Sequence, residues 1–226
     1  MTADPAAALD PAGREKLETV LALLAEERAS VSSVVDQRAW RVHVLDSLTG
    51  LEVPELSEAG LIADVGAGAG FPGLALAVAL PATRIDLVES VARKCEFMRR
   101  AVEAAGIENA SVVNARSEEL AAAAGREAYD AVTARAVGRL STLAELASPL
   151  LKPNGVLVAW KGRRDPDEEK QLANAAEALA MSAGTVLDVG GRAGSRHRHL
   201  HVIHKSAPTP ANLPRRPGMA KKRPRG

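Results

Sequence analysis

The chain has 226 residues, of which 46% are hydrophobic and 25% are charged. This composition excludes a chain that is disordered throughout, and the length suits one domain with an appendage. The single cysteine, Cys95, excludes a disulfide scaffold and an all-cysteine metal site. The first ten residues do not resemble a secretory signal, and no clean apolar run approaches the ~20 residues that cross a bilayer. We therefore expect a cytoplasmic protein without a membrane partner.

The net charge of +1 hides a polarised distribution. Residues 189–226 contain ten Lys and Arg and no Asp or Glu, whereas the preceding residues carry 19 basic and 28 acidic side chains. A basic segment of this kind typically meets a polyanion, although a solvated tail that only aids solubility has the same composition. Only 2% of the residues are aromatic, so RNA binding would depend on phosphate contacts and arginine rather than on base stacking.

Two helices are predicted within residues 1–50, which we expect to form an N-terminal helical cap. Asp10-Pro11 is a typical N-cap and first-turn proline, and apolar residues from Leu17 to Leu24 repeat with helical spacing. A second helix is predicted over Trp40–Leu48, and a loop is predicted from Leu51 to Glu58.

Predicted strands alternate with predicted helices from residue 61 onward. The strands are Leu61–Val65, Arg84–Glu89, Ser111–Asn114, Ala131–Ala134, Val156–Trp160, Thr185–Val189 and Leu200–His204. The helices are Leu74–Leu80, Val91–Ala105, Ser117–Ala123, Leu140–Leu150 and Pro166–Met181. This alternation predicts an α/β domain over residues 51–206, with a mainly parallel sheet between helices. No helix fits before the last strand, which suggests that it runs antiparallel. The Pro- and Arg-rich residues 207–226 are predicted to form a basic flexible tail.

The strongest motif is the glycine-rich turn from Asp64 to Gly73, DVGAGAGFPG, between the first predicted strand and the next helix. In doubly wound sheets a nucleotide-type ligand binds at this turn, where glycine lets the ligand approach the backbone. Asp64 ends the strand, where it can meet a charged amine. Glu89 ends the next strand, 23 residues after Gly66, and suits the two hydroxyls of a ribose.

Two ligands compete for this turn, and a purely structural role is the third interpretation. A dinucleotide prefers G-x-G-x-x-G directly after the strand, but counting from Gly66 puts Phe71 at the third glycine position. The pattern fits only when it starts at Gly68, two residues late. S-adenosylmethionine (SAM) has no pyrophosphate, and an acid serves its sulfonium and amino groups better. The motif therefore favours SAM.

Several blocks of the sequence resemble the RsmG (GidB) family, bacterial methyltransferases that modify N7 of a guanine in 16S ribosomal RNA. The blocks are His43–Leu48, Asp64–Gly73, Leu87–Arg99, Arg116–Glu119, Thr133–Ala136, Trp160–Gly162, Arg198–Leu200 and Pro214–Lys222. Any one block is weak evidence, but together and in this order they are specific. The resemblance implies a Rossmann-like SAM-dependent methyltransferase fold with a seven-stranded sheet. It also implies that the substrate is 16S rRNA, for which we expect the context of the small ribosomal subunit and a monomeric enzyme.

The resemblance also implies site residues. Gly66 and Phe71 would contact SAM, Ser117 and Glu118 would border the adenine, and Arg135 would line the cofactor and target pocket. With the residues of the glycine turn, the predicted cofactor-binding set is Asp64, Gly66, Gly68, Gly70, Phe71, Glu89, Ser117, Glu118 and Arg135. The predicted RNA-binding set is His43, Arg139, Lys161, Arg163, Arg198, Arg215, Arg216, Lys221 and Lys222.

The sequence shows no obvious acid–base pair, and methylation of guanine N7 does not need one. Guanine N7 carries an unprotonated lone pair, so no general base is required and no catalytic residue is assigned. We expect catalysis by alignment, with Arg135 orienting O6 or a phosphate. Cys95 is predicted to lie within a helix, away from the glycine turn, and no metal site is predicted. The alternatives are a dinucleotide-dependent oxidoreductase and a nucleic-acid-binding protein without activity.

Overall fold

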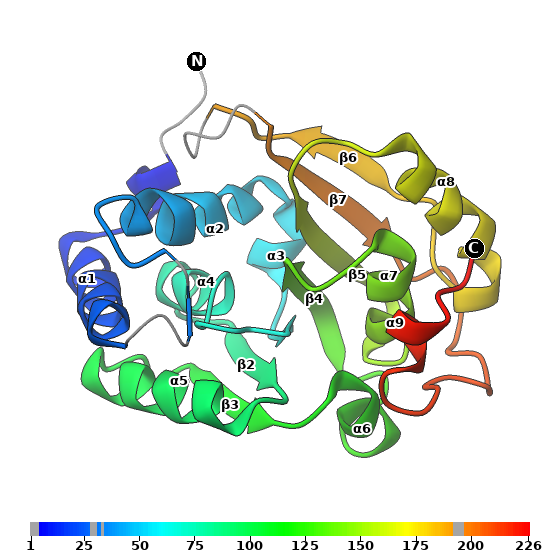
Figure 1. The fold of residues 1–226 in the computed structure, drawn as a ribbon, viewed down its shortest axis with the longest axis horizontal. Helices are drawn as coiled ribbons and strands as arrows, with labels where there is room; N and C mark the ends of the chain where they lie inside the picture. The colour runs from blue at the N-terminus through cyan, green and yellow to red at the C-terminus, as the bar shows by residue number, and fades with distance from the viewer. Residues whose placement is uncertain (1–4, 28–30, 33, 192–196) are drawn as a thin grey trace.

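The computed structural model describes residues 5–27, 31–32, 34–191 and 197–226. Its centre is a seven-stranded sheet in the order β3-β2-β1-β4-β5-β7-β6 (Figure 1). The strands are β1 (Leu61–Val65), β2 (Arg84–Glu89), β3 (Ala110–Asn114), β4 (Tyr129–Arg135), β5 (Leu151–Lys161), β6 (Thr185–Asp188) and β7 (His199–His204). The strands β1 to β5 pair in parallel, whereas β7 is antiparallel to both β5 and β6. This confirms the predicted α/β fold and the reversed last strand.

Helices cover both faces of the sheet. They are η1 (Pro5–Ala8), α1 (Pro11–Glu26), η2 (Trp40–Leu45), α2 (Asp46–Leu48), η3 (Thr49–Glu52), α3 (Pro54–Glu58), α4 (Gly73–Ala79), α5 (Ala92–Ala104), α6 (Ser117–Ala122), α7 (Leu140–Ala147), α8 (Pro166–Ala175), η4 (Glu177–Leu179) and α9 (Met219–Lys222). Figure 1 shows α1, α2, α4 and α5 on one side of the sheet, with α7, α8 and α9 on the other. No helix in the described part of the chain is long and apolar enough to cross a membrane.

The core has two layers because successive residues of a strand point to opposite faces. Ile62 of β1 packs in the layer under α1, α4 and α5, and its neighbour Ala63 packs in the layer under α7 and α8. In β5, Val158 and Trp160 belong to the first layer, whereas Leu157 belongs to the second. Burial on both faces explains apolar runs such as Val156–Trp160 within β5.

The N-terminal cap differs from the prediction in its helices. The second predicted helix is a π-helix, η2, that continues into the short α-helix α2. The expected loop from Leu51 to Glu58 is wrong, since η3 runs to Glu52 and only Val53 separates it from α3. Pro54 occupies the first helical position of α3, where its fixed φ favours a helix, and Leu56 is fully buried. Residues 1–4, 28–30 and 33 of the predicted cap lie outside the described residues.

Residues 207–226 pack against the domain, in contrast to the flexible tail expected from their composition. Leu213 is buried, and its carbonyl accepts a hydrogen bond of 3.0 Å from Arg126. Arg215 donates to the buried carboxylate of Glu145 on α7, over 2.5 Å from Nε, and α9 packs on the same helix. Acidic side chains of the body therefore hold the basic segment in place.

Candidate cofactor and RNA site

The glycine turn after β1 holds three left-handed residues in one short stretch. Gly66, Gly68 and Gly70 have φ values of 68°, 61° and 88°, a region that residues with a Cβ rarely adopt. A Cβ on Gly66 would lie 2.7 Å from Val137, and one on Gly70 would lie 2.4 Å from Leu74. The turn is tied to the end of β2, because the amide of Gly66 donates to the carbonyl of Val88 over 2.8 Å. Gly66 and Gly70 are therefore required by both backbone and packing, whereas Gly68 is required by its backbone conformation alone.

Asp64 fixes the start of α4 from inside the sheet. Its two carboxylate oxygens accept hydrogen bonds of 2.9 Å from the amide of Gly73 and from the hydroxyl of Thr133. Burial raises the pKa of Asp64 to about 6, against the lowering effect of these two hydrogen bonds. Asp64 is completely buried and does not line the cavity described below, so the structure gives it a role in positioning the turn.

Glu89, at the end of β2, is shared between the turn and the next helix. One carboxylate oxygen accepts a hydrogen bond of 3.1 Å from the amide of Gly68, and the other accepts one of 2.9 Å from the amide of Val91. Each oxygen keeps a further lone pair for another donor. Glu89 is thus held rigidly beside the glycine turn, as its position 23 residues after Gly66 predicts.

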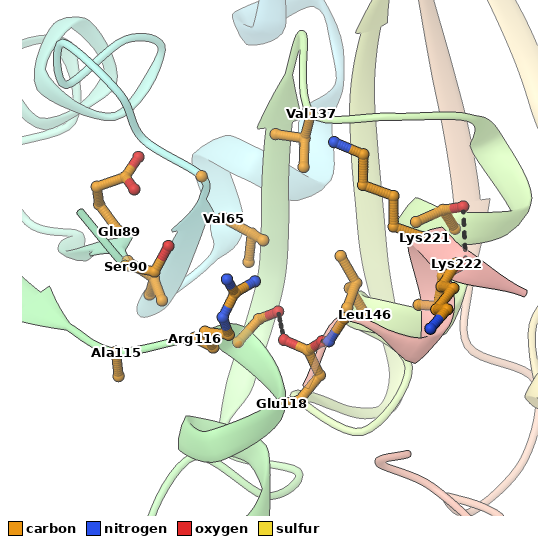
Figure 2. A pocket seen from close by; sticks show the side chains of 16 residues that line it. Val65, Glu89, Ser90, Ala115, Arg116, Glu118, Val137, Leu146, Lys221 and Lys222 are labelled. Atoms are coloured by element: carbon orange, nitrogen blue, oxygen red, sulfur yellow. Dashed lines mark hydrogen bonds between the residues drawn. The ribbon is translucent and has the colours of Figure 1, made fainter. Parts of the chain in front are cut away.

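A cavity of about 460 Å³ opens beside the glycine turn and is called the first cavity below (Figure 2). The residues that line it are Val65, Gly66, Val88, Glu89, Ser90, Ala115, Arg116, Ser117, Glu118, Val137, Thr142, Leu146, Gly218, Ala220, Lys221 and Lys222. Of the predicted cofactor set, Gly66, Glu89, Ser117 and Glu118 meet here. Ser117 also donates to the carboxylate of Glu118 over 3.2 Å.

A second cavity of about 380 Å³ lies on the other side of the segment that follows β4. Val137 lines the first cavity, while its neighbours Ala136 and Gly138 line the second. The second cavity is lined by Ser32, Val34, Val42, His43, Arg135, Ala136, Gly138, Trp160, Lys161, Gly162 and Arg198. None of these residues is Asp or Glu, so the cavity presents cations to its interior.

Asp46 bridges the two arginines of the second cavity. Arg135 Nη1 lies 2.9 Å from one oxygen of the Asp46 carboxylate, and Arg198 Nε lies 2.6 Å from the other. The side chains of Arg135 and Arg198 are 12% and 22% exposed, whereas that of Asp46 is 2% exposed. Two guanidinium groups share one carboxylate, so the cluster keeps a surplus positive charge that faces the cavity.

His43 connects the glycine turn to this cluster. Its ring stacks on Phe71, with centroids 5.1 Å apart, and its Nε2 lies 2.9 Å from the carbonyl of Val34. Burial lowers the pKa of His43, so the ring is neutral at pH 7, with Nε2 donating to Val34 and Nδ1 free to accept from Arg135 at 3.3 Å. Phe71 is therefore part of the turn but lies against the cap rather than in the first cavity.

Lys161 and Glu168 support the turn that starts α7. Lys161 donates to the carboxylate of Glu168 over 2.6 Å and to the carbonyl of Gly138 over 3.0 Å. The same Glu168 oxygen accepts a hydrogen bond of 2.7 Å from the amide of Leu140. Lys161 therefore lines the second cavity but is already paired, which the sequence did not predict.

The predicted RNA-binding residues fall into three groups. His43, Lys161 and Arg198 line the second cavity. Arg139, Arg163 and Arg216 are exposed, the first two beside the ends of β4 and β5. The remaining residues belong to the C-terminal segment: Arg215 is paired with Glu145, and Lys221 and Lys222 line the first cavity.

Known proteins resemble this chain over most of its length. The family model described as rRNA small subunit methyltransferase G (GidB) matches residues 15–200. The chain belongs to this family. It is 39% identical over 222 residues to the ribosomal RNA small subunit methyltransferase G of Rubrobacter xylanophilus, covering 94% of this chain and 85% of the relative. It is 40% identical to that of Chloroflexus aggregans, covering 88% and 83%.

The fold is that of SAM-dependent methyltransferases. An O-methyltransferase from Bacillus cereus, solved in complex with SAH, superposes with a TM-score of 0.56 at 16% identity, covering 87% of this chain and 91% of that one. Membership of the methyltransferase G family together with this fold makes the chain a SAM-dependent methyltransferase, as predicted. The two alternatives, an oxidoreductase and a binding protein without activity, are not supported.

The structure also gives roles to residues that belong to neither predicted site set. Asp46, Thr133 and Glu168 hold the arginines and the two turns, but each acts on partners far away in the chain. Gly218 and Ala220 reach the first cavity from the end of the chain. Asp46 lies within the family-like block His43–Leu48, which is the one signal that could have drawn attention to it.

Proposed function

We propose that this protein transfers the methyl group of SAM to N7 of a guanine in 16S rRNA. One observation supports this most: a cavity beside the glycine turn and a cation-lined cavity without a carboxylate adjoin at residues 135–138. Such an arrangement suits a cofactor on one side of this segment and a nucleotide of an anionic polymer on the other. The methyltransferase G names of the relatives support rRNA of the small subunit as the substrate.

The residues of the first cavity fit SAM. Its volume lies in the range of small-molecule sites, roughly 300–1,000 Å³. The backbone amides of Gly68 and Val91 hold the Glu89 carboxylate in place, and its oxygens keep lone pairs for the ribose hydroxyls. Gly66 leaves room for a ligand against the backbone, and Ser117 and Glu118 stand where the adenine is expected. When bound, SAM supplies an electrophilic methyl group on its sulfonium.

The second cavity fits a nucleophile that needs no deprotonation. Guanine N7 already carries a free lone pair, whereas an exocyclic amine would have to lose a proton. Among the described residues, the titratable groups that line this cavity are His43 and three cations, and both ring nitrogens of His43 have partners. Cys95 is buried in α5, donates to the carbonyl of Glu89, and has its pKa raised by burial, so it does not supply a thiolate. The chain therefore acts by orienting the base.

Arg135 and Arg198 are placed to hold the substrate without opposing the transfer of the methyl group. Positive charge develops on the purine as the methyl group transfers, and a free guanidinium beside N7 would oppose it. The Asp46 carboxylate between the two arginines offsets part of their charge. Arginine also forms bidentate contacts to guanine or phosphate oxygens, so Arg135 is placed to orient O6 or a phosphate.

The proposal includes a biological setting. We place the protein in the cytoplasm, acting as a monomer on 16S rRNA within the small ribosomal subunit. The exposed Arg139 and Arg163 stand beside the second cavity, where phosphates flanking the target guanine would pass.

Radiolabelled SAM and unmethylated small subunits, or deproteinised 16S rRNA, test the proposal. We expect one guanine to gain the label at N7, located by chemical cleavage of the RNA at 7-methylguanine. Label in the subunits but not in the free RNA would place the substrate in the assembled particle. Label on another base atom, or on no RNA, would contradict the proposed reaction.

A further inference from the structure

The C-terminal segment supplies one side of the first cavity. Gly218, Ala220, Lys221 and Lys222 line it, opposite residues that follow β2 and β3. Figure 2 shows the Lys221 side chain extending toward Val137 across the cavity. These residues lie more than 70 positions after any other residue of the cavity lining, so the chain returns to the site after the sheet is complete.

Two hydrogen bonds tie this segment to other lining residues. The amide of Gly218 donates to the carboxylate of Glu118 over 2.7 Å, and the hydroxyl of Thr142 donates to the carbonyl of Ala220 over 3.3 Å. Glu118 is 8% exposed and also accepts from Ser117, so both of its oxygens are engaged. The tail therefore sets the orientation of the residue that borders the predicted adenine position.

A buried ion pair anchors the segment from behind. Both Arg215 Nε and Nη2 donate to Glu145, over 2.5 and 2.6 Å, in the bidentate geometry that gives the strongest arginine–carboxylate contacts. Glu145 is 3% exposed and lies on α7, the helix that also carries Thr142 and Leu146 of the cavity lining. The anchor and the lining thus share one rigid element.

We propose that residues 214–222 form a wall of the SAM site and enclose the adenosine part of the cofactor. This inference rests on the assignment of the first cavity to SAM in the proposed function. It gives Lys221 and Lys222 a place in the cofactor site, where their aliphatic stems supply apolar surface, and differs from the RNA contact predicted from their charge.

Hydrogen exchange of the unmodified protein, with and without SAM, tests the wall directly. SAM should slow exchange of the amides in residues 216–223 as well as those in the glycine turn. Slowing in the glycine turn alone would overturn the wall while leaving the cofactor site intact. If SAM slows exchange in neither region, the proposed function fails.

Calorimetric titration of variants with SAM gives the size of the effect. Ending the chain after Leu213 keeps that buried residue and removes the wall, and we expect SAM affinity to fall by about tenfold or more. Gly218→Pro should displace the wall and lower SAM affinity in the full-length chain. Proline lacks the amide that donates to Glu118 and cannot adopt a φ of 81°. Thermal unfolding of each variant shows whether the domain is intact.

Arg223→Gln is the matched control. It removes one positive charge from the same segment at an exposed side chain that does not line the cavity, and its SAM affinity should stay within about twofold of the parent. A truncated protein that binds SAM as tightly as the parent would overturn the proposal. Equal losses in the control and in the truncated protein would do so too, since they would reflect charge rather than the wall.

Discussion

The two cavities on either side of residues 135–138 are formed by different kinds of groups, backbone in one and charged side chains in the other. The first is shaped by backbone, with left-handed glycines and amides that fix the Glu89 carboxylate. The second is shaped by charged side chains, in which the buried Asp46 offsets part of the charge of two arginines. A backbone-built site tolerates almost no added atoms, whereas a charge-built site depends on keeping its ion balance. Changes to the two should therefore fail in different ways.

The largest effect is expected from Asp46→Asn. Removing the charge of a buried carboxylate leaves two guanidinium groups uncompensated, and losing one partner of a buried ion pair typically costs about 3–5 kcal/mol. Urea unfolding should show this loss, and methylation of RNA should fall while SAM still binds. Asp36→Asn, at an exposed pair with Arg38, should leave the free energy of unfolding almost unchanged. Similar losses in both variants would contradict the view that the second cavity depends on its ion balance.

A pH-dependent effect is expected at Asp64, beside the first cavity. Because burial raises its folded pKa to about 6, the folded state favours the protonated carboxyl. The stability that Asp64 contributes is present below its unfolded pKa of about 3.9 and is lost as the pH rises through 6, a change on the order of 3 kcal/mol.

Asp64→Asn isolates this contribution. The amide can accept from Gly73 and donate to the hydroxyl of Thr133, so both contacts survive. The variant should gain stability relative to the parent between pH 4 and pH 7, measured by urea unfolding across that range. A constant difference between the two proteins at all pH values would show that Asp64 does not titrate in this window.

Gly66→Ala tests the steric side of the comparison, with Gly106→Ala as its match. Both glycines have a φ near 60°, but a Cβ on Gly66 would lie 2.7 Å from Val137 while one on Gly106 meets nothing within 4 Å. Each should lose about 1 kcal/mol from backbone strain. Only Gly66→Ala should also lose SAM affinity, by about tenfold in calorimetry. Equal SAM affinity in the two variants would mean that the turn can accommodate a Cβ at residue 66.

The smallest effect is expected from Arg163→Gln at the rim of the second cavity. Removing one phosphate contact should lower the slope of log affinity against log salt by about one unit and leave SAM binding unchanged. Arg84→Gln, at the start of β2 on the opposite edge of the sheet, removes the same charge and should leave the slope unchanged. Filter binding to 16S rRNA fragments at several salt concentrations measures both. An unaltered slope for Arg163→Gln would remove this residue from the RNA contact.

Local patterns predicted most of the sheet, because each central strand is a short apolar run ended by a turn. The bounds of β1 and β2 were predicted to the residue. The glycine turn and Glu89 were also predictable, since their spacing reflects neighbouring strands. The loop expected at Leu51–Glu58 was wrong because the helix-starting role of Pro54 was overlooked.

Other parts of the site depend on partners that local patterns cannot identify. Asp46 meets Arg135 and Arg198, which lie about 90 and 150 positions further along the chain. The C-terminal segment has the composition of a solvated tail, and contacts across the fold, such as those to the buried Glu145 and to the amide of Gly218, reveal that it packs. Composition reports charge, but it does not report which acid across the fold will neutralise it.

The reversal of β7 determines which end of that strand faces the second cavity. Lys161 at the end of β5 is paired with His199 at the beginning of β7. A parallel β7 of six residues would carry its first residue to the far edge, roughly 20 Å away. By running backwards, the strand delivers Arg198 from late in the chain to the same edge as Arg135. The antiparallel strand β7 thus supplies the second of the two arginines that Asp46 bridges, and the parallel strand β4 supplies the first.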